Sequence, residues 1–197
     1  MKNLLITLGL LLTLLIAMEF SFAGQWEIDK EHSQIGFTVG HLVGKVSGVF
    51  TDFSGSFAFD GKKPETAKGG TITVKTASID TNNGKRDEHL RAVDFFDVGK
   101  FPEMTAENAV LTVSEKNKYK LKTDLTIKGV RKPVVFDVEY SGSAKDPWGN
   151  LRAGFTAKTK LNRKDFGMSW NKTLDNGGLL VGNDVDVTIL IEAVAKK

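Results

Sequence analysis

The chain has 197 residues, of which 41% are hydrophobic and 26% are charged, the composition of an ordinary globular protein. It contains no cysteine, which excludes disulfides, thiolate metal sites, iron–sulfur clusters and cysteine nucleophiles. The net charge of +3 comes from scattered lysines, so the basic stripe typical of nucleic-acid-binding proteins is absent and no nucleic-acid partner is expected.

The first 23 residues have the three parts of a secretory signal peptide. Lys2 supplies a positive charge, an apolar run covers residues 4–18, and Ser21-Phe22-Ala23 is a small-residue cleavage site. The alternative is a membrane anchor, but the apolar run is shorter than the roughly 20 residues that a spanning helix needs. We therefore expect cleavage after Ala23, export, and a single mature domain over residues 24–197.

The mature chain is predicted to be a succession of β-strands, because apolar and polar residues alternate in run after run. The runs lie near residues 34–41, 46–50, 57–59, 72–74, 111–113, 119–127, 134–140, 153–159 and 185–191. Turn sequences such as Asp60-Gly61 and Asp146-Pro147-Trp148-Gly149-Asn150 separate them. Short connections indicate antiparallel pairing, so we expect an all-β domain of about eight strands, closed as a barrel or packed as a sandwich.

Two segments depart from this alternation. Residues 85–96 are predicted to form a short helix, with Asn82 or Asn83 as its cap and with Leu90 and Val93 facing the core. A second helical turn is expected over residues 162–166.

The polar residues do not form a recognisable catalytic or metal site. The histidines, His32, His41 and His89, lack the close spacing of metal ligands, so neither a metal nor a cofactor is predicted. No Gly-x-Ser-x-Gly elbow is present, and His32 and the adjacent Ser33 would point to opposite faces of a strand. Asp87, Asp94 and Asp97 are more simply explained as helix caps and solvated side chains than as an acid–base pair. No catalytic residue is predicted.

Phenylalanine accounts for 13 residues, and many of these lie on predicted inner faces beside small residues. Either the phenylalanines fill the core, or the small residues leave a tunnel for a ligand, and the sequence leaves both interpretations open. Gly48 and Ala157 are the small inward positions where a large side chain would block such a tunnel. The residues predicted to line an apolar pocket are Phe37, Phe50, Phe53, Phe57, Leu90, Phe95, Phe136, Phe155, Phe166 and Trp170.

A dense polar run, Arg86-Asp87-x-His89, lies on the predicted helix. In one interpretation, Arg86 and Asp87 clasp the helix to the barrel rim through charge-assisted hydrogen bonds. In the other, Arg86 and His89 meet the polar end of a ligand. The clasp is favoured for Arg86, and both interpretations stay open for His89.

Several motifs, taken in order, resemble those of the YceI-like family. They are Trp26-x-Ile28-Asp29, His32-Ser33-x-Ile35-x-Phe37-x-Val39-x-His41, Val46-x-Gly48-x-Phe50-x-x-Phe53-x-Gly55, Ser78-Ile79-x-Thr81, Arg86-Asp87-x-His89-Leu90, Asp94-Phe95-Phe96-Asp97, Phe101-Pro102, Leu125-Thr126-Ile127-x-Gly129-Val130, Arg163-x-Asp165-Phe166-Gly167 and Val181-Gly182-x-Asp184-Val185. They cover nearly all of the mature chain. Arg131 departs from the family pattern, which has threonine there, but it lies at a turn and puts little in doubt.

The resemblance implies a lipocalin-like antiparallel β-barrel with one or two short helices, located in the periplasm. It implies a binding protein, not an enzyme, that stores or shuttles a long-chain isoprenoid or similar amphipathic lipid in an elongated apolar tunnel. The polar head of the lipid would remain near the mouth, where Arg86, His89 or Arg163 could meet it.

Several alternatives remain at this stage. One is a periplasmic, stress-related structural or interaction protein with a filled barrel, and another is an enzyme that acts on a lipid or a quinone. Transient contact with a membrane surface is compatible with the positive charge. The oligomeric state is left open, with a homodimer as one option.

Overall fold

A computed structural model describes residues 24–175 and 177–196, apart from the side chain of Lys68. The predicted signal peptide lies outside the described residues. The strands are β1 (Gly24–Ile28), β2 (Gln34–His41), β3 (Gly44–Phe50), β4 (Phe53–Asp60), β5 (Lys63–Lys75), β6 (Ile79–Asp80), β7 (Glu103–Glu115), β8 (Lys118–Ile127), β9 (Val130–Lys145), β10 (Leu151–Asn162) and β11 (Val181–Ala195). The helices are α1 (Gly84–Arg91) and the 3₁₀ turns η1 (Lys30–His32), η2 (Thr76–Ser78) and η3 (Arg163–Phe166).

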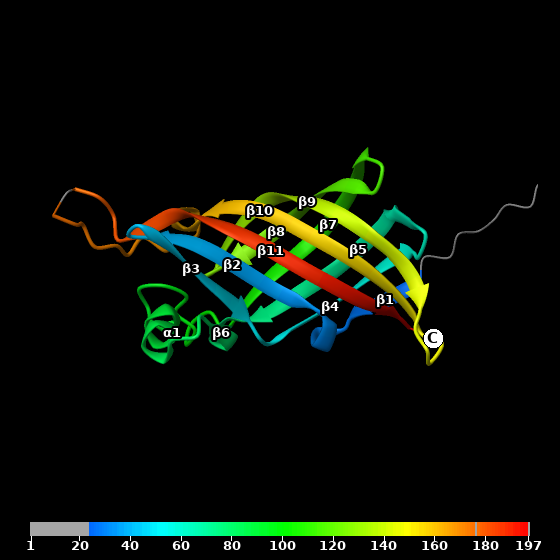
Figure 1. Cartoon of the computed structure of the whole chain (residues 1–197), viewed down its shortest axis with the longest axis horizontal. Coiled ribbons are helices and arrows are strands. Elements are labelled where there is room, and N and C mark those ends of the chain that lie inside the picture. The colour runs from blue at the N-terminus through cyan, green and yellow to red at the C-terminus, as the bar shows by residue number, and fades with distance from the viewer. Residues whose placement is uncertain (1–23, 176, 197) are drawn as a thin grey trace, which may run out of the picture.

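Eight of these strands form a closed antiparallel barrel in the order β1-β4-β5-β7-β8-β9-β10-β11, because β1 pairs with both β4 and β11 (Figure 1). The strands β2, β3 and β6 continue the sheet from β11. The long strand β11 serves both arrangements, since its first part pairs with β2 and its last residues pair with β1. The predicted all-β barrel of about eight strands is therefore confirmed, and the chain does not form a sandwich.

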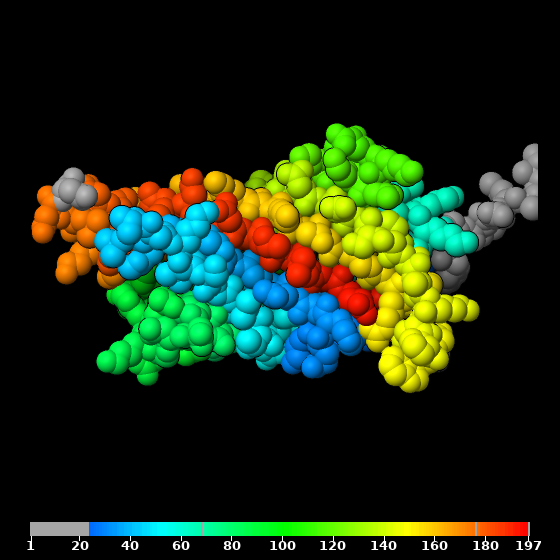
Figure 2. Space-filling model, viewed as in Figure 1, coloured from blue at the N-terminus to red at the C-terminus, as the bar shows by residue number. Residues whose placement is uncertain are grey.

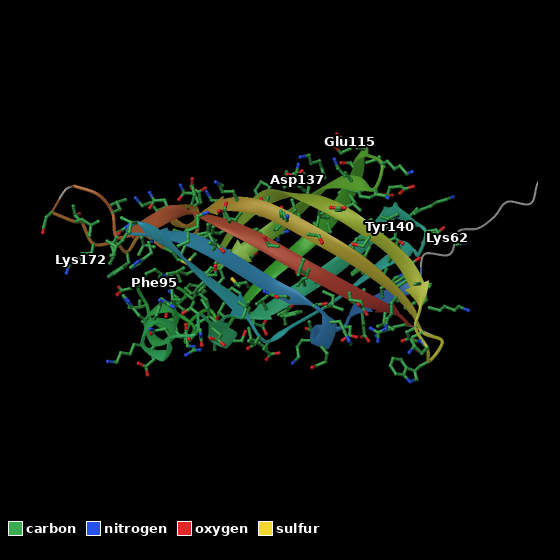
Figure 3. All side chains as sticks on the ribbon, viewed as in Figure 1. Lys62, Phe95, Glu115, Asp137, Tyr140 and Lys172 are labelled. Carbon is green, nitrogen blue, oxygen red and sulfur yellow. The ribbon has the colours of Figure 1, made fainter. Side chains whose placement is uncertain are left out.

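The barrel is elongated, and its two ends differ (Figure 1). At one end lie α1, the turn between β2 and β3, and residues 171–175 and 177–180, which precede β11; we call this the helix end. The C-terminus and the turn between β9 and β10 lie at the other end, which we call the C-terminal end. Figure 3 shows Phe95 and Lys172 at the helix end and Tyr140 toward the C-terminal end.

Aromatic side chains fill the barrel at its C-terminal end. We call this cluster the aromatic plug: Trp26, Phe57, Phe59, Tyr140 and Phe155. Trp26 and Phe59 are almost completely buried, and their ring centroids lie 4.5 Å apart. The polar atoms of the plug are satisfied, since Trp26 Nε1 donates to the Phe59 carbonyl (3.1 Å) and the Tyr140 hydroxyl donates to the Gly61 carbonyl (2.8 Å). This half of the barrel is a packed core.

The predicted helix exists, but it ends at Arg91 and not at residue 96. Asn83 caps it as expected, since its side-chain oxygen accepts a hydrogen bond from the Arg86 backbone amide (3.0 Å). The expectation that Val93 faces the core is wrong, because Val93 follows the helix and is 69% exposed. The second predicted turn is the 3₁₀ helix η3. Among the described residues, no helix has the length and apolar character needed to cross a membrane.

Candidate functional site: an apolar cavity at the helix end

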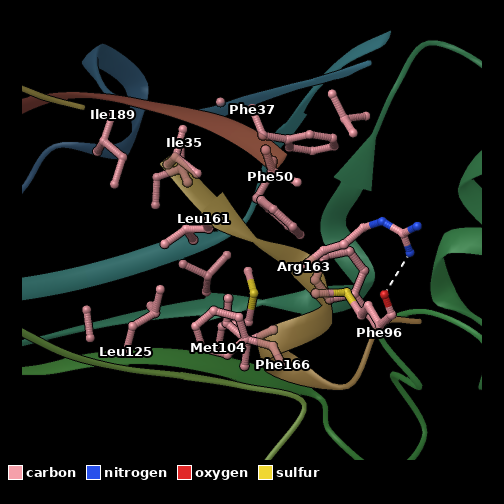
Figure 4. A pocket seen from close by; sticks show the side chains of 18 of the residues that line it. Ile35, Phe37, Phe50, Phe96, Met104, Leu125, Leu161, Arg163, Phe166 and Ile189 are labelled. Carbon is pink, nitrogen blue, oxygen red and sulfur yellow. Dashed lines mark hydrogen bonds between the residues drawn. The ribbon is translucent and has the colours of Figure 1, made fainter. Parts of the chain in front are cut away.

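An apolar cavity of about 180 Å³ lies in the barrel between the aromatic plug and α1. Strand residues from around the barrel point into it, among them Ile35, Leu125, Leu161 and Ile189 (Figure 4). Residues after α1, including Phe95, close the cavity at the helix end, and we call this side of the cavity its mouth. Apart from Thr105 and Arg163, every side chain on the cavity wall is hydrophobic. Such a wall offers a ligand burial of apolar surface and very few hydrogen bonds.

The size of the cavity limits what it holds in this conformation. Its volume is similar to that of an engineered apolar cavity of about 150 Å³ that binds benzene, and it is below the roughly 300–1,000 Å³ of typical ligand pockets. A long lipid chain therefore needs side chains of the wall to move. The aromatic plug closes the cavity toward the C-terminal end, so the cavity is blind on that side.

The predicted pocket residues fall into four groups. On the cavity wall lie Phe37, Phe50, Leu90, Phe95, Phe136 and Phe166. Phe53 packs in the same hydrophobic cluster behind the wall, whereas Phe57 and Phe155 belong to the aromatic plug. Trp170 lies beside the mouth, where its ring contacts His89 and Phe95. The wall also contains Met104, Ala106 and Met168, which the sequence analysis missed because they lie in runs with little alternation.

Arg86 and Asp87 hold α1 against the end of β6. Arg86 donates from Nε to Thr81 Oγ1 (2.7 Å) and from Nη2 to the Thr81 carbonyl (2.8 Å). The buried Asp87 carboxylate accepts from the Thr81 backbone amide (3.0 Å) and from Thr81 Oγ1 (2.5 Å). This geometry is that of a clasp, and Arg86 is not on the cavity wall.

Arg163 is 4% exposed and forms part of the wall near the mouth. Its guanidinium donates to the carbonyls of Met168 (2.7 Å), Trp170 (2.8 Å) and Gly182 (2.8 Å). Figure 4 shows its aliphatic part beside Phe96 and Phe166, with the guanidinium directed away from the centre of the cavity. Burial lowers the pKa of this group from its ordinary value. Arg163 thus ties together the two segments that border the mouth.

His89 contacts the ring of Trp170, whereas Arg163 contacts its carbonyl. The His89 ring is 4.8 Å from the Trp170 ring and 5.0 Å from the Phe95 ring, both edge-to-face. Its Nε2 lies 3.2 Å from Asp94 Oδ2. Of the three predicted head-group residues, the structure therefore brings Arg163 and His89 to one mouth, linked by Trp170, and directs Arg86 toward Thr81.

Gly48 and Ala157 are not positions at which a large side chain would simply block the cavity, as the sequence had led us to expect. Gly48 does lie on the same face as Phe50, but a Cβ there would be 2.6 Å from Phe37 Cζ and 2.9 Å from the Asp80 carbonyl oxygen. Gly48 is thus a point of close approach between strands, and a large side chain would disrupt the sheet before it blocked a tunnel. Ala157 faces inward beside Tyr119, Phe136 and Val138, but it is not on the cavity wall.

A polar cluster at the C-terminal end also escaped the sequence analysis. The side chains of Asp29, His32 and Glu192 converge within 4.8 Å of one another, an arrangement that their sequence spacing does not reveal. Arg152 lies among them, with Nη1 2.7 Å from Asp29 Oδ2 and 2.5 Å from Glu192 Oε1. The Arg152 guanidinium therefore already supplies the positive charge that a metal ion would otherwise bring to these carboxylates.

Comparisons with known proteins agree with this architecture. The model of the YceI-like domain matches residues 26–193. A UPF0312 protein of Azotobacter vinelandii is 40% identical over 177 residues, which are 88% of each chain. The crystal structure of a YceI protein of Campylobacter jejuni has a TM-score of 0.69 and 35% identity, covering 86% of this chain and 96% of that one. A domain from Saccharophagus degradans, described as polyisoprenoid binding, has a TM-score of 0.63 and 13% identity, covering 89% and 99%.

Proposed function

This chain belongs to the YceI-like family, and we propose that it binds a long-chain isoprenoid or a similar amphipathic lipid and stores or shuttles it in the periplasm. The observation that carries the proposal is an internal cavity whose wall is hydrophobic except for Thr105 and Arg163. The polyisoprenoid-binding domain from Saccharophagus degradans has the same fold, which supports a ligand of this class.

The driving force for binding is burial of the hydrocarbon chain. Each CH₂ group transferred from water into the barrel contributes about 0.8 kcal/mol, and the lost chain entropy offsets part of that gain. Because the aromatic plug closes the far side, the lipid enters tail first and its head remains at the mouth. His89, Trp170 and Arg163 are the residues nearest to that position.

A cavity of about 180 Å³ is too small for a full isoprenoid chain, so the lipid must enlarge it. Phe95 and Phe96 close the mouth and come from the turn after α1, outside the strand ladder. Their displacement would lengthen the cavity toward the helix end without breaking strand pairs. We therefore place the elongated tunnel of the loaded protein in this direction.

A structural or interaction role remains the second candidate, because the aromatic plug fills the C-terminal end of the barrel as a solid core would. Native mass spectrometry of the purified protein, followed by lipid extraction, separates the two. A lipid carrier shows a bound mass that extracts as an amphipathic lipid. A structural protein shows the mass of the polypeptide alone, and this result would overturn the proposal.

A blocking substitution tests where the lipid lies. Ala106 is a small residue on the cavity wall, paired with Ile72 and Leu125, which also line it. We expect Ala106→Phe to reduce lipid occupancy severalfold while the β-sheet circular dichroism signal persists, since the ring takes up ligand volume. Ala58→Phe is the matched control, because Ala58 alternates with the inward Phe57 and Phe59 and so faces outward. Equal lipid occupancy in both variants would contradict this location.

A further inference from the structure

Four large aliphatic side chains are exposed at the helix end of the barrel. Val43 is 106% exposed, Val93 69%, Leu42 56% and Leu179 44%. They come from three segments that are far apart in sequence: the β2–β3 turn, the turn after α1, and the segment that leads into β11. Figure 2 shows these segments together at one end of the molecule, in cyan, green and orange. We call Leu42, Val43, Val93 and Leu179 the mouth face.

Hydrogen bonds fix the backbone of this face. The Leu42 amide donates to the Leu180 carbonyl (3.1 Å), and Leu179 forms a β-bridge with Thr173. Lys128 Nζ donates to the Val93 carbonyl (2.7 Å). Leu42 also has φ 52, a left-handed conformation that favours glycine or asparagine over leucine. Apolar side chains are thus held outward on a hydrogen-bonded backbone, and the left-handed conformation of Leu42 lowers the stability of the fold.

The mouth face surrounds the side of the cavity that the aromatic plug does not close. Val93 lies between Leu90 and Phe95 in sequence, and both of these line the cavity. Leu179 is two residues from Val181, which lines it as well. Exposed aliphatic side chains therefore lie within a few positions of residues that line the cavity, on two separate segments. Exposed apolar side chains gathered at one end of a protein are typical of an interaction site.

Charges on the same segments indicate what this surface contacts. Lys85 and Lys172 are exposed, and neither has a carboxylate partner among the residues that the structure describes. Lys45 has only a 3.8 Å ion pair with Asp186. Glu88, Asp94 and Asp175 are exposed acids on these segments, and Asp94 lies 3.2 Å from His89, so the face is of mixed charge. Lysines around an apolar patch match the phosphate groups that cover the hydrocarbon of a bilayer.

From these observations we propose that the mouth face docks on the surface of a phospholipid bilayer, with its aliphatic side chains at the level of the lipid head groups. Docking places the mouth, which Phe95 and Phe96 close, against the membrane, so that a lipid tail that displaces them passes between bilayer and barrel without crossing water. This reason for docking rests on the proposed lipid-carrier function, but the contact itself is measured independently of it.

The experiment measures binding of the purified protein to vesicles of phosphatidylcholine, with and without phosphatidylglycerol. We expect binding to both, stronger where phosphatidylglycerol is present. Val43→Asp and Leu179→Asp should each weaken the partition coefficient at least about tenfold, because each places a charge where an aliphatic side chain met lipid. Val43 is fully exposed, so its replacement leaves the fold intact.

Two control variants locate the contact. Val113→Asp changes an exposed valine near the β7–β8 turn, away from the mouth face, and its vesicle binding should equal that of the wild type. Trp148→Ala removes the most exposed aromatic residue of the C-terminal end, and it too should have no effect. Binding that is lost in Trp148→Ala, or retained in Val43→Asp and Leu179→Asp, overturns the proposal. So does absence of wild-type binding, including the case in which the mouth face instead forms a dimer.

A second readout separates docking from lipid binding. Farnesol, a short prenol, can be added to the protein in the absence of vesicles. Val43→Asp should bind farnesol like the wild type and yet take up a long prenol from vesicles at least about tenfold more slowly. If the wild type binds vesicles but no prenol, the proposed function fails and the docking result stands.

Discussion

Asp146 shows how a single carboxylate organises the C-terminal end of the barrel. Its Oδ1 accepts from the backbone amides of Trp148 (3.0 Å) and Asn150 (2.8 Å). Its Oδ2 accepts from Asn150 Nδ2 and Arg152 Nε, both at 3.0 Å. Burial raises the pKa of this carboxyl, but the hydrogen bonds outweigh burial and lower the pKa from 3.8 to about 2.

The lowered pKa of Asp146 predicts a pH dependence of stability. A carboxyl whose pKa is lower in the folded state stabilises the fold fully above its unfolded pKa of 3.8, and this contribution is lost as the pH falls through about 2. We expect Asp146→Asn to melt below the wild type at neutral pH, with a difference in Tm that narrows from about pH 4 to pH 2 in thermal unfolding. Glu31→Gln, at an exposed side chain, is the control. A difference that stays constant with pH would contradict the assignment.

At the scale of secondary-structure elements, α1 is held mainly by hydrogen bonds from polar side chains, those of Arg86, Asp87 and Arg91. The helix is short and carries mainly polar side chains, so it buries little apolar surface. Asn83 caps its first turn, and Asp87 joins it to Thr81. Because the turn after α1 carries Phe95 and Phe96 to the cavity, the position of this helix determines how the mouth is closed.

Removal of the Asp87 carboxylate should therefore loosen this element selectively. In Asp87→Ala, the buried Thr81 amide and hydroxyl lose their acceptor, at a cost of about 1–3 kcal/mol. Hydrogen–deuterium exchange should increase in residues 79–101 and remain unchanged in β8 and β9. Glu88→Ala, at the exposed neighbouring position, should leave both regions as in the wild type. Unchanged exchange in Asp87→Ala would show that other contacts hold the helix.

At the scale of the whole molecule, the barrel begins where the predicted signal peptide ends. Gly24 is the first residue of β1 and pairs with Phe59, so cleavage after Ala23 would leave every described strand intact. We predict that the mature protein starts at or next to Gly24 and is released by osmotic shock, as determined by N-terminal sequencing. Ala23→Arg should block cleavage and leave the precursor with the membrane. Folded wild-type protein with an intact Met1 in the membrane fraction would contradict the prediction.

The sequence by itself determined most of the strands and their inner faces, though not β1 or β6, and it limited the helix cap to Asn82 or Asn83. Alternation is a local property, so Phe37, Phe50 and Phe136 could be assigned to the interior without knowledge of their neighbours. Turn and capping residues act over a few positions, which is why Asn83 and the turn at residues 146–150 were recognisable. Alternation thus placed Phe37, Phe50 and Phe136 on the cavity wall, whereas Phe95 reaches the wall from the turn after α1 and not from the helix.

Only the tertiary structure decided which part of the barrel is hollow. Alternation says that Phe57 and Phe155 face inward, but not that they meet Phe59 and fill one end. It puts Gly48 on the inner face, but not the Phe37 ring that covers it. It gives no sign that Arg152 pairs with Asp29, 123 positions away. The physical reason is that the period of a strand fixes the direction of a side chain, whereas space, charge pairing and the mouth of a cavity depend on segments that meet only when the barrel closes.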